Sequence, residues 1–230
     1  SFVGNTISVK PQFTLEPEAN RAKLIHNSQF IIESDWSSAS YWYSIVALYE
    51  IDFQVTLFSY KKNSLQGDSA LANIYKDFGV ETVFNEDNSI TITKTKNHQL
   101  SIVNYQLNNC PDIAQTIAVT CFGLGIGCHL TGLHTLKIKE TDRLEALKTE
   151  LTKLGPTISV TNESLTLEAS NHINEIISFY IYQDHRMAMA FAPLALKISL
   201  TINQAEVVSK SYPDFWEDLK IIGIVGSEVD

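Results

Sequence analysis

The feature of this sequence that most constrains its fold is a long internal repeat. Three copies of one pattern begin with an aspartate at the start of an apolar run rich in alanine and serine, at Asp35, Asp112 and Asp184, so the copies lie 77 and 72 residues apart. Each aspartate can be a helix N-cap, and for Asp35 this is the interpretation we favour. Solenoid repeats are shorter, at roughly 20–50 residues. The pattern therefore predicts a few large units packed around a common axis.

The order of elements is the same in each copy. The apolar run has no polar face, which is typical of a buried helix, and a β-branched stretch, a polar loop and an amphipathic outer helix follow it. Gly79 and Gly155 stand where that second helix should end, as glycine commonly does. Alternating strands around a polar turn come next. The predicted strands are residues 54–58, 127–133 and 198–202 after the apolar runs, and the hairpins are residues 81–84 with 90–93 and 157–160 with 164–167.

The third copy is incomplete. Residues 213–222 predict a helix, but no strand–turn–strand pattern follows them. At the other end, residues 5–13 and 29–33 have the pattern of strands that precede the first copy. We therefore expect a fragment of an α/β protein, whose missing partner strands come from sequence that is not present here.

Lysine and arginine gather in two clusters, residues 137–143 and 184–186, and Lys210 follows them, although the chain has a formal net charge of −9. Arginine offers a planar fork for carboxylate or phosphate, and lysine adds a mobile point charge. At helix starts, which expose N–H groups, such clusters favour a pocket for a small, multiply charged anion. The alternative is a pair of solvated helix starts with surface ion pairs. Recurrence at matching places in the repeat favours the pocket.

The carboxylates and the histidine beside these cations have two interpretations each. Asp112 either caps a helix or accepts a proton from a substrate hydroxyl. Glu140 is either the salt-bridge partner of Lys139 and Arg143 or an acid/base that they hold ionised. His185 is either a proton carrier or, as we favour, a residue that orients its neighbours.

Several classes of protein are disfavoured. A sequence pI near 5.1 argues against a nucleic-acid partner. No apolar stretch approaches the ~20 residues that span a bilayer, and the first residues do not resemble a signal peptide. An odd number of cysteines in apolar or glycine-rich surroundings predicts reduced core thiols in a cytoplasmic protein. A zinc site at Cys121, Cys128, His129 and His134 lacks paired C-x-x-C spacing, so we predict no metal and no cofactor.

Two classes of function remain. One is an enzyme that handles a phosphorylated, carboxylated small molecule. The other is a non-catalytic repeat scaffold or binding module, in which the cations form only surface ion pairs. Cations at equivalent positions in two copies favour the enzyme. The scaffold predicts that replacing Arg186 or Lys139 by alanine leaves small-anion binding unchanged.

These motifs resemble the enolpyruvyl transferase family, in the branch whose acceptor is shikimate 3-phosphate. The matching stretches occur in the family's order from about residue 30 to 222, and as a set they are highly specific. The stretches are DWSSASY (35–41), NSLQGD (63–68), PD (111–112), KETDR (139–143), DHRMAM (184–189) and KSYPD (210–214). The resemblance implies that phosphoenolpyruvate and shikimate 3-phosphate give 5-enolpyruvylshikimate 3-phosphate and phosphate through a tetrahedral adduct.

The resemblance also implies roles for single residues. Asp112 is similar to the base near the shikimate 5-hydroxyl, and Lys139 to the lysine that contacts that hydroxyl. Glu140 is similar to the residue that handles the proton at the methylene carbon of phosphoenolpyruvate. Thr135 stands where many relatives have asparagine, and Asp184 and His185 are supporting residues. The cations expected to hold phosphoenolpyruvate are Arg143, Arg186 and Lys210.

The family fold has two similar domains, each with three βαβαββ units around a pseudo-threefold axis, with buried helices and outer sheets. The resemblance implies that residues 34–230 are the C-terminal domain, with its third unit incomplete, and that residues 1–33 are the tail of the neighbouring domain and the crossover. It also implies that the missing strands come from the N-terminal part of the same protein. The family's lysine-rich start, glycine-rich loop and Ser-Ser-Gln element are absent here, and the linker at 16–28 matches the family poorly.

Overall fold

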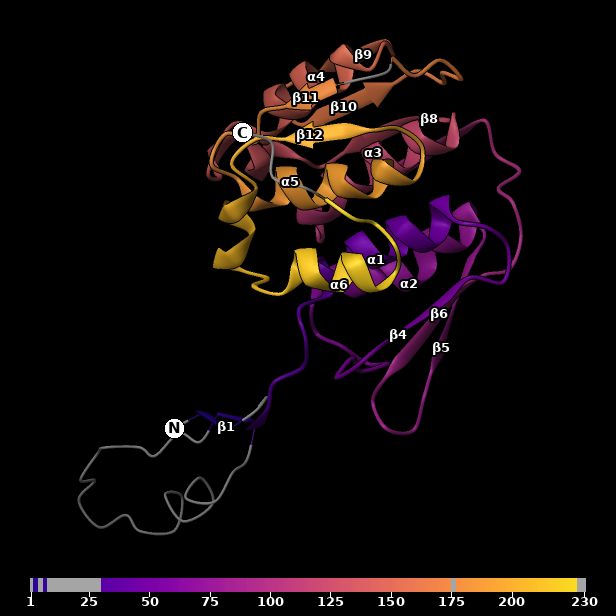
Figure 1. Cartoon of the computed structure of the whole chain (residues 1–230), viewed down its shortest axis with the longest axis vertical. Helices are drawn as coiled ribbons and strands as arrows, with labels where there is room; N and C mark the ends of the chain where they lie inside the picture. Colours follow the sequence, from indigo (N-terminus) through magenta and orange to yellow (C-terminus); the bar gives the residue numbers. More distant parts are fainter. Residues whose placement is uncertain (1, 4–5, 8–29, 175–176, 227–230) are drawn as a thin grey trace, which may run out of the picture.

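The computed structural model describes residues 2–3, 6–7, 30–174 and 177–226, and its centre is formed by three helices with sheets outside them (Figure 1). The central helices are α1 (Trp36–Leu48), α3 (Ala114–Leu124) and α5 (His185–Phe191), one from each copy of the repeat. α1 contacts α3, α3 contacts α5, and α1 contacts the 3-10 segment η6 (Ala192–Leu196) that continues α5. The predicted fold, three α/β units with buried helices and outer sheets, is confirmed.

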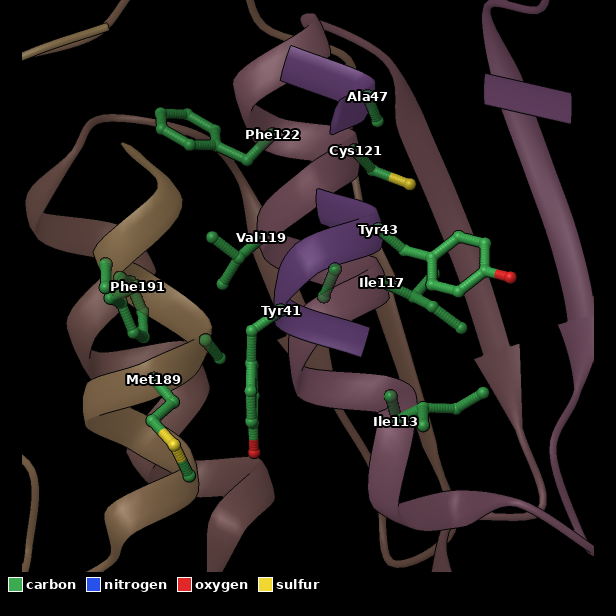
Figure 2. Packing of buried hydrophobic residues seen from close by; sticks show 14 of the residues in the cluster. Tyr41, Tyr43, Ala47, Ile113, Ile117, Val119, Cys121, Phe122, Met189 and Phe191 are labelled. Atoms are coloured by element: carbon green, nitrogen blue, oxygen red, sulfur yellow. The ribbon is translucent and has the colours of Figure 1, made fainter. Parts of the chain in front are cut away.

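The central helices are buried because they carry small residues and pair their own hydroxyls. Every residue of α1 except Ser38 is buried. Ser40 Oγ lies 3.0 Å from Thr116 Oγ1, and Thr120 Oγ1 donates to Ser44 Oγ at 2.8 Å, so these hydroxyl groups between α1 and α3 are satisfied. Larger side chains fill the remaining space (Figure 2). They include Tyr41 and Tyr43 from α1, Ile117, Val119 and Phe122 from α3, and Met189 and Phe191 from α5.

Each unit contributes a sheet. The first sheet is antiparallel and has the order β4 (Gln54–Leu57), β6 (Ile90–Lys94), β5 (Val80–Phe84). The second has the order β7 (Ile102–Gln106), β8 (Gly127–Thr131), β10 (Ser164–Leu167), β9 (Ile158–Val160), with β7 and β8 parallel. The third pairs β11 (Ile177–Phe179) and β12 (Leu200–Ile202) in parallel. The predicted strands and hairpins are confirmed, with ends that shift by one or two residues.

Among the described residues, the third sheet has two strands, whereas the second has four. Residues 203–226 contain no strand, and within the described ranges β12 pairs only with β11, whereas β8 has a neighbour on both sides. A separate small sheet has the order β1 (Phe2–Val3), β2 (Thr6–Ile7), β3 (Phe30–Ile31). The rest of the predicted strand at 5–13 and the linker at 16–28 lie outside the described residues. The division at residue 33 stays a prediction.

The outer helix differs between the units. α4 (Arg143–Lys153) is the expected amphipathic helix of the second unit. A continuous helix was the wrong prediction for the first unit, which has the short pieces η2 (Gly67–Ala70), α2 (Leu71–Ile74) and η3 (Tyr75–Phe78). The third unit has η7 (Ala205–Lys210) and α6 (Phe215–Ile221). Both predicted terminal glycines are left-handed, and a Cβ on Gly79 would lie 1.9 Å from the carbonyl oxygen of Lys96.

A buried lysine joins the first sheet to two helix ends. Lys94, the last residue of β6, is 1% exposed. Its Nζ donates to the carbonyl oxygens of Ala47 and Phe78, at 2.8 and 2.7 Å, which lie at the ends of α1 and η3. Carbonyl groups at helix ends lack a hydrogen-bond donor within the helix, and the ammonium group of Lys94 serves as that donor for these two. Burial, with a contribution from Lys197, lowers the pKa of Lys94 to about 8.

In the described part of the chain, no helix has the length and apolarity needed to cross a membrane, and no group of His, Cys, Asp and Glu side chains is placed to hold a metal ion. The three cysteines are buried and unpaired, as predicted for core thiols. They are Cys110, Cys121 and Cys128.

Candidate active site

Charged side chains from three distant segments meet at the starts of two central helices, α3 and α5. Each segment leads into a helix, and the second one also follows a 3-10 turn. The segments are η4 (Pro111–Ile113), which carries Asp112; the residues Lys139 and Glu140 after η5 (His134–Ile138), with Arg143 at the start of α4; and Asp184 to Arg186 at the start of α5.

Arg143 is the centre of this cluster. Its side chain is 1% exposed and its guanidinium group contacts three carboxylates. Nε donates to Asp184 Oδ2 at 2.6 Å and Nη2 to Asp184 Oδ1 at 3.3 Å. Nη1 donates to Asp112 Oδ1 at 3.1 Å, and Nη2 donates to Glu140 Oε2 at 2.6 Å. One N–H of Nη1 is left without an acceptor among the described residues, so Arg143 mainly organises the acids around it.

Asp112 is surrounded by cations. Lys139 Nζ lies 3.1 Å from its Oδ1, Arg143 Nη1 lies 3.1 Å from the same oxygen, and Arg186 Nη2 lies 3.7 Å from Oδ2. The Asp112 side chain keeps 25% of its surface exposed. The exposed part of the carboxylate can therefore contact a substrate while the ion pairs hold the side chain in position.

The repeated aspartate has a different role in the second unit. Asp35 and Asp184 are N-caps, because Asp35 Oδ1 accepts from Ser37 N at 2.9 Å and Asp184 Oδ1 accepts from Arg186 N at 2.8 Å. The N-cap of α3 is the residue after Asp112 and makes no side-chain capping bond. The capping interpretation of Asp112 is therefore wrong, and its carboxylate is available to the cluster.

Electrostatics hold the carboxylates of Asp112 and Glu140 ionised. Burial alone would raise the pKa of Asp112, but the charges of Arg186, Lys139 and Arg143 outweigh it and keep the pKa below its ordinary value. Burial opposes ionisation of Glu140 too, but its own backbone N–H and Arg143 lower the pKa. Glu140 was expected to contact both Lys139 and Arg143. It bonds to Arg143, whereas Lys139 pairs with Asp112.

His185 and Arg186 complete the side of the cluster formed by α5, and each side chain is 15% exposed. His185 Nδ1 lies 3.9 Å from Glu140 Oε1. Burial lowers the pKa of His185, although Asp184 opposes the shift, so the ring is neutral at pH 7. A neutral ring beyond hydrogen-bond distance of Glu140 fits the orienting interpretation, which stays a prediction.

Two predicted residues are not joined to the cluster. Lys210, the last residue of η7, is exposed, and no described ion pair or hydrogen bond links it to the acids. Thr135 lies in η5, and its buried Oγ1 has no hydrogen-bond partner among the described residues. Of the three cations expected to converge, Arg143 and Arg186 share Asp112, and the position of Lys210 in the site stays a prediction.

The structure adds a support that the sequence analysis did not assign. Residues 63–68 lie against the start of α1, where Gln66 Oε1 accepts from Trp36 N at 2.9 Å. Asp68 accepts a short hydrogen bond from Ser37 Oγ, and burial raises the pKa of Asp68. The polar, glycine-containing pattern of 63–68 predicts a loop. The sequence pattern does not show that this loop contacts the start of α1, about thirty residues earlier in the chain.

This arrangement can couple anion binding to proton abstraction. Lys139 and Arg186 each contact Asp112 through a partly exposed side chain, whereas Arg143 is nearly saturated. Phosphate and carboxylate groups bind such cations through strong charge-assisted hydrogen bonds. An anion that draws Lys139 or Arg186 away removes charges that lower the pKa of Asp112, which then becomes a better proton acceptor.

Comparison with known proteins shows which family this chain belongs to. The family model described as EPSP synthase (3-phosphoshikimate 1-carboxyvinyltransferase) matches residues 3–219. The chain belongs to the EPSP synthase family. The resemblance found in the sequence motifs is confirmed.

Relatives in the EPSP synthase family are longer than this chain. The 3-phosphoshikimate 1-carboxyvinyltransferase of Bacteroides fragilis is 43% identical over 213 residues, which are 88% of this chain and 50% of the relative. That of Photobacterium damsela subsp. piscicida is 31% identical over 229 residues, which are 95% of this chain and 52% of the relative. The chain thus spans about half the length of the curated relatives it matches.

Solved structures agree on the fold. EPSP synthase from Acinetobacter baumannii superimposes with a TM-score of 0.69 at 22% identity, covering 84% of this chain and 47% of that chain. An enolpyruvyl transferase from Streptomyces tendae gives a TM-score of 0.59 at 14% identity and covers 84% of this chain and 43% of that chain. The chain therefore has the architecture of about half of an enolpyruvyl transferase.

Proposed function

We propose that this chain is the C-terminal portion of an enzyme that transfers the enolpyruvyl group of phosphoenolpyruvate to the 5-hydroxyl of shikimate 3-phosphate and releases phosphate. This reaction belongs to the shikimate pathway of aromatic amino acid biosynthesis. Membership of the EPSP synthase family supports the proposal. The structural observation that carries it is Asp112 in contact with Lys139, Arg143 and Arg186, beside Glu140.

In this proposal Asp112 accepts the proton of the 5-hydroxyl while that oxygen attacks the central carbon of phosphoenolpyruvate. Lys139, 3.1 Å from Asp112, contacts the same hydroxyl. The cations that turn to the substrate's phosphate and carboxylate raise the basicity of Asp112 at the moment it is needed. They also stabilise the charge that develops in the tetrahedral adduct.

Glu140 handles the proton at the methylene carbon. Its Oε2 is fixed by Arg143, and 43% of its side chain is exposed. The carboxylate is ionised, which is the state that removes a proton when phosphate leaves the adduct. To deliver that proton in the addition step, Glu140 must first become protonated, which exclusion of water by bound substrates would favour.

The remaining site residues bind and support. Arg186 and Lys210 are proposed to hold the carboxylate and phosphate of phosphoenolpyruvate, and Arg143 offers its remaining N–H. Thr135 is proposed to meet shikimate 3-phosphate, because its buried hydroxyl has no partner in the described part of the protein. Asp184 and His185 orient their neighbours.

The proposed partner is the N-terminal part of the same protein. The chain spans about half of its relatives, and within the described ranges one side of β12 lacks the strand that β8 has. A strand supplied by that part would complete the third sheet. We also propose a cytoplasmic location, which the three unpaired thiols favour.

Phosphate release from phosphoenolpyruvate and shikimate 3-phosphate tests this function. The chain alone should show no turnover, and adding the N-terminal part expressed from the upstream coding sequence should restore a kcat above ~1 per second. The Asp112→Asn variant should not be restored. Turnover at that rate by the chain alone would refute the fragment interpretation, and no turnover by the two parts together would refute the proposed reaction.

A further inference from the structure

The turn that leads into Asp184 has an unfavourable backbone. Asp184 N donates to the carbonyl oxygen of Ile181 at 2.8 Å, and the two residues between them have positive φ, 55° at Tyr182 and 60° at Gln183. This geometry is a type I′ turn, which asparagine and glycine favour strongly. Tyrosine and glutamine do not favour it, so contacts with the rest of the protein must hold the turn in place.

A buried carboxylate on α4 supplies such contacts. Glu150 is 0% exposed, and its Oε1 accepts from the Tyr182 hydroxyl at 2.7 Å. Its Oε2 accepts from the backbone N–H of Tyr180 at 3.1 Å. Both oxygens of Glu150 are therefore bonded to the segment that forms the turn.

The same helix also holds the residue that follows the turn. Arg143, in the first turn of α4, donates to Asp184, and Glu150 lies two turns further along. Figure 1 shows α4 beside β11, whose chain runs on into this turn and then into α5. Two side chains of α4 therefore bond to the turn: Glu150 accepts from Tyr182, and Arg143 donates to Asp184.

We propose that Glu150 is a positioning residue that, through Tyr182, holds the turn so that Asp184 meets both Arg143 and the backbone of Arg186. Arg186 is thereby set for the anion, and this last consequence rests on the proposed function. Glu150 also pairs with Lys153, at 2.5 Å, and Lys153 Nζ donates to the carbonyl oxygen of Ser178 and lies 4.9 Å from the centre of the Tyr180 ring, but no described contact joins Lys153 to residues 181–184. An ordinary ion pair on α4 does not account for the two bonds from Tyr180 and Tyr182.

The backbone N–H of Arg186 donates a hydrogen bond to Asp184 Oδ1. The rate at which this N–H exchanges its hydrogen, measured in the chain without any substrate, tests the proposal. Tyr182→Phe removes one hydroxyl and should speed that exchange by about fivefold, the factor expected for one lost hydrogen bond. Tyr180→Phe is the matched control, because its ring is 62% exposed and its hydroxyl makes no described hydrogen bond. The control should exchange as the unaltered chain does.

A second variant separates turn geometry from any direct effect of the hydroxyl. Replacing Tyr182 by Asn and Gln183 by Gly favours a type I′ turn without the bond to Glu150, so slow exchange at Arg186 should be retained. Glu150→Gln should also retain most of the slow exchange at Arg186, because the glutamine amide can still bond to the Tyr180 backbone N–H and to the Tyr182 hydroxyl. Equal exchange in Tyr182→Phe and Tyr180→Phe would overturn the proposal, and so would fast exchange in the Asn-Gly variant.

Phosphoenolpyruvate affinity, measured with the same variants, addresses the consequence for the site. Tyr182→Phe should weaken binding about fivefold, in step with the exchange. If exchange at Arg186 changes as expected but the unaltered chain binds no phosphoenolpyruvate, the positioning role stands and the proposed function fails. If binding is present and exchange does not respond to Tyr182→Phe, the positioning role fails alone.

Discussion

Arg143 and Asp184, 41 residues apart in the chain, form a buried two-point ion pair with Nε–Oδ2 and Nη2–Oδ1 distances of 2.6 and 3.3 Å. The Arg143 side chain is 1% exposed and that of Asp184 is 0% exposed. The pair joins the second unit to the third at the start of α5. The cluster around Asp112 is therefore part of the packing of the units, and not an addition to their surface.

Removing one partner of this pair should strongly destabilise the fold. Arg143→Met leaves the Asp184 carboxylate buried without its cation, and the free energy of unfolding should fall by about 3–5 kcal/mol. Arg143→Met combined with Asp184→Asn should cost less than Arg143→Met alone, because no buried charge remains unpaired. Urea unfolding measures both. A loss below about 1 kcal/mol in the single variant, as for a surface pair, would contradict the burial of the pair.

Lys94 should make the fold more stable as pH rises above 8. Its pKa in the folded chain is about 8, below its ordinary value of 10.5, so the unfolded chain holds more protons between these values. Stability therefore rises with pH across this window and gains nothing further from Lys94 above it. The measurement is the difference in unfolding free energy between the unaltered chain and Lys94→Met, from pH 7 to 10.5. A difference that does not change with pH would contradict the lowered pKa.

The Asp112 carboxyl should titrate below its ordinary pKa of 3.8, and Arg186→Ala should raise that pKa. The reason is that Arg186 is the largest of the charges that oppose the effect of burial on Asp112. Because the folded pKa is lowered, the contribution of Asp112 to stability is present at neutral pH and is lost as pH falls through the folded value. Carbon NMR of the carboxyl group measures it. Lys148→Ala, on the exposed face of α4, serves as the control and should leave the pKa unchanged.

Thr135 and Thr120 should respond differently to replacement by valine. Thr135 Oγ1 is buried without a described partner, so Thr135→Val should leave the midpoint of thermal unfolding unchanged or raise it slightly. Thr120 Oγ1 is hydrogen-bonded to Ser44 Oγ and to the carbonyl oxygen of Thr116, so Thr120→Val should cost about 1–3 kcal/mol. If Thr135 meets shikimate 3-phosphate, Thr135→Val should still weaken binding of that substrate when the N-terminal part is present. Equal destabilisation by both changes would mean that Thr135 has a partner.

The sequence predicts those features of the fold that depend on residues close together in the chain. Asp35 at a helix start and Gly79 at a helix end have side-chain and backbone preferences that act within a few residues, and the structure confirms both. Lys94 lies in an ordinary strand pattern. Its burial depends on carbonyl groups from two helices that reach it only after the units pack.

The candidate site shows the same limit. Residue types and repeat positions indicate that Asp112, Glu140 and Arg186 share a site. They do not indicate that Arg143 is nearly saturated by acids, because Asp184 reaches it from another unit. Glu150 has the pattern of a residue on an amphipathic helix with Lys153 three residues on, and its bond to Tyr182 appears only in the tertiary structure.

The most direct test of the central claim, that this cluster is half of an enolpyruvyl transferase site, is a calorimetric titration of the chain with phosphoenolpyruvate. We predict weak binding, near ~1 mM or about −4 kcal/mol, that weakens with added salt because an exposed half-site is screened over ~8–10 Å. The Arg186→Ala variant should lose this binding, and Lys148→Ala should keep it. Binding that is the same in the unaltered chain and in Arg186→Ala, or no binding by the unaltered chain at tens of millimolar, would contradict the claim.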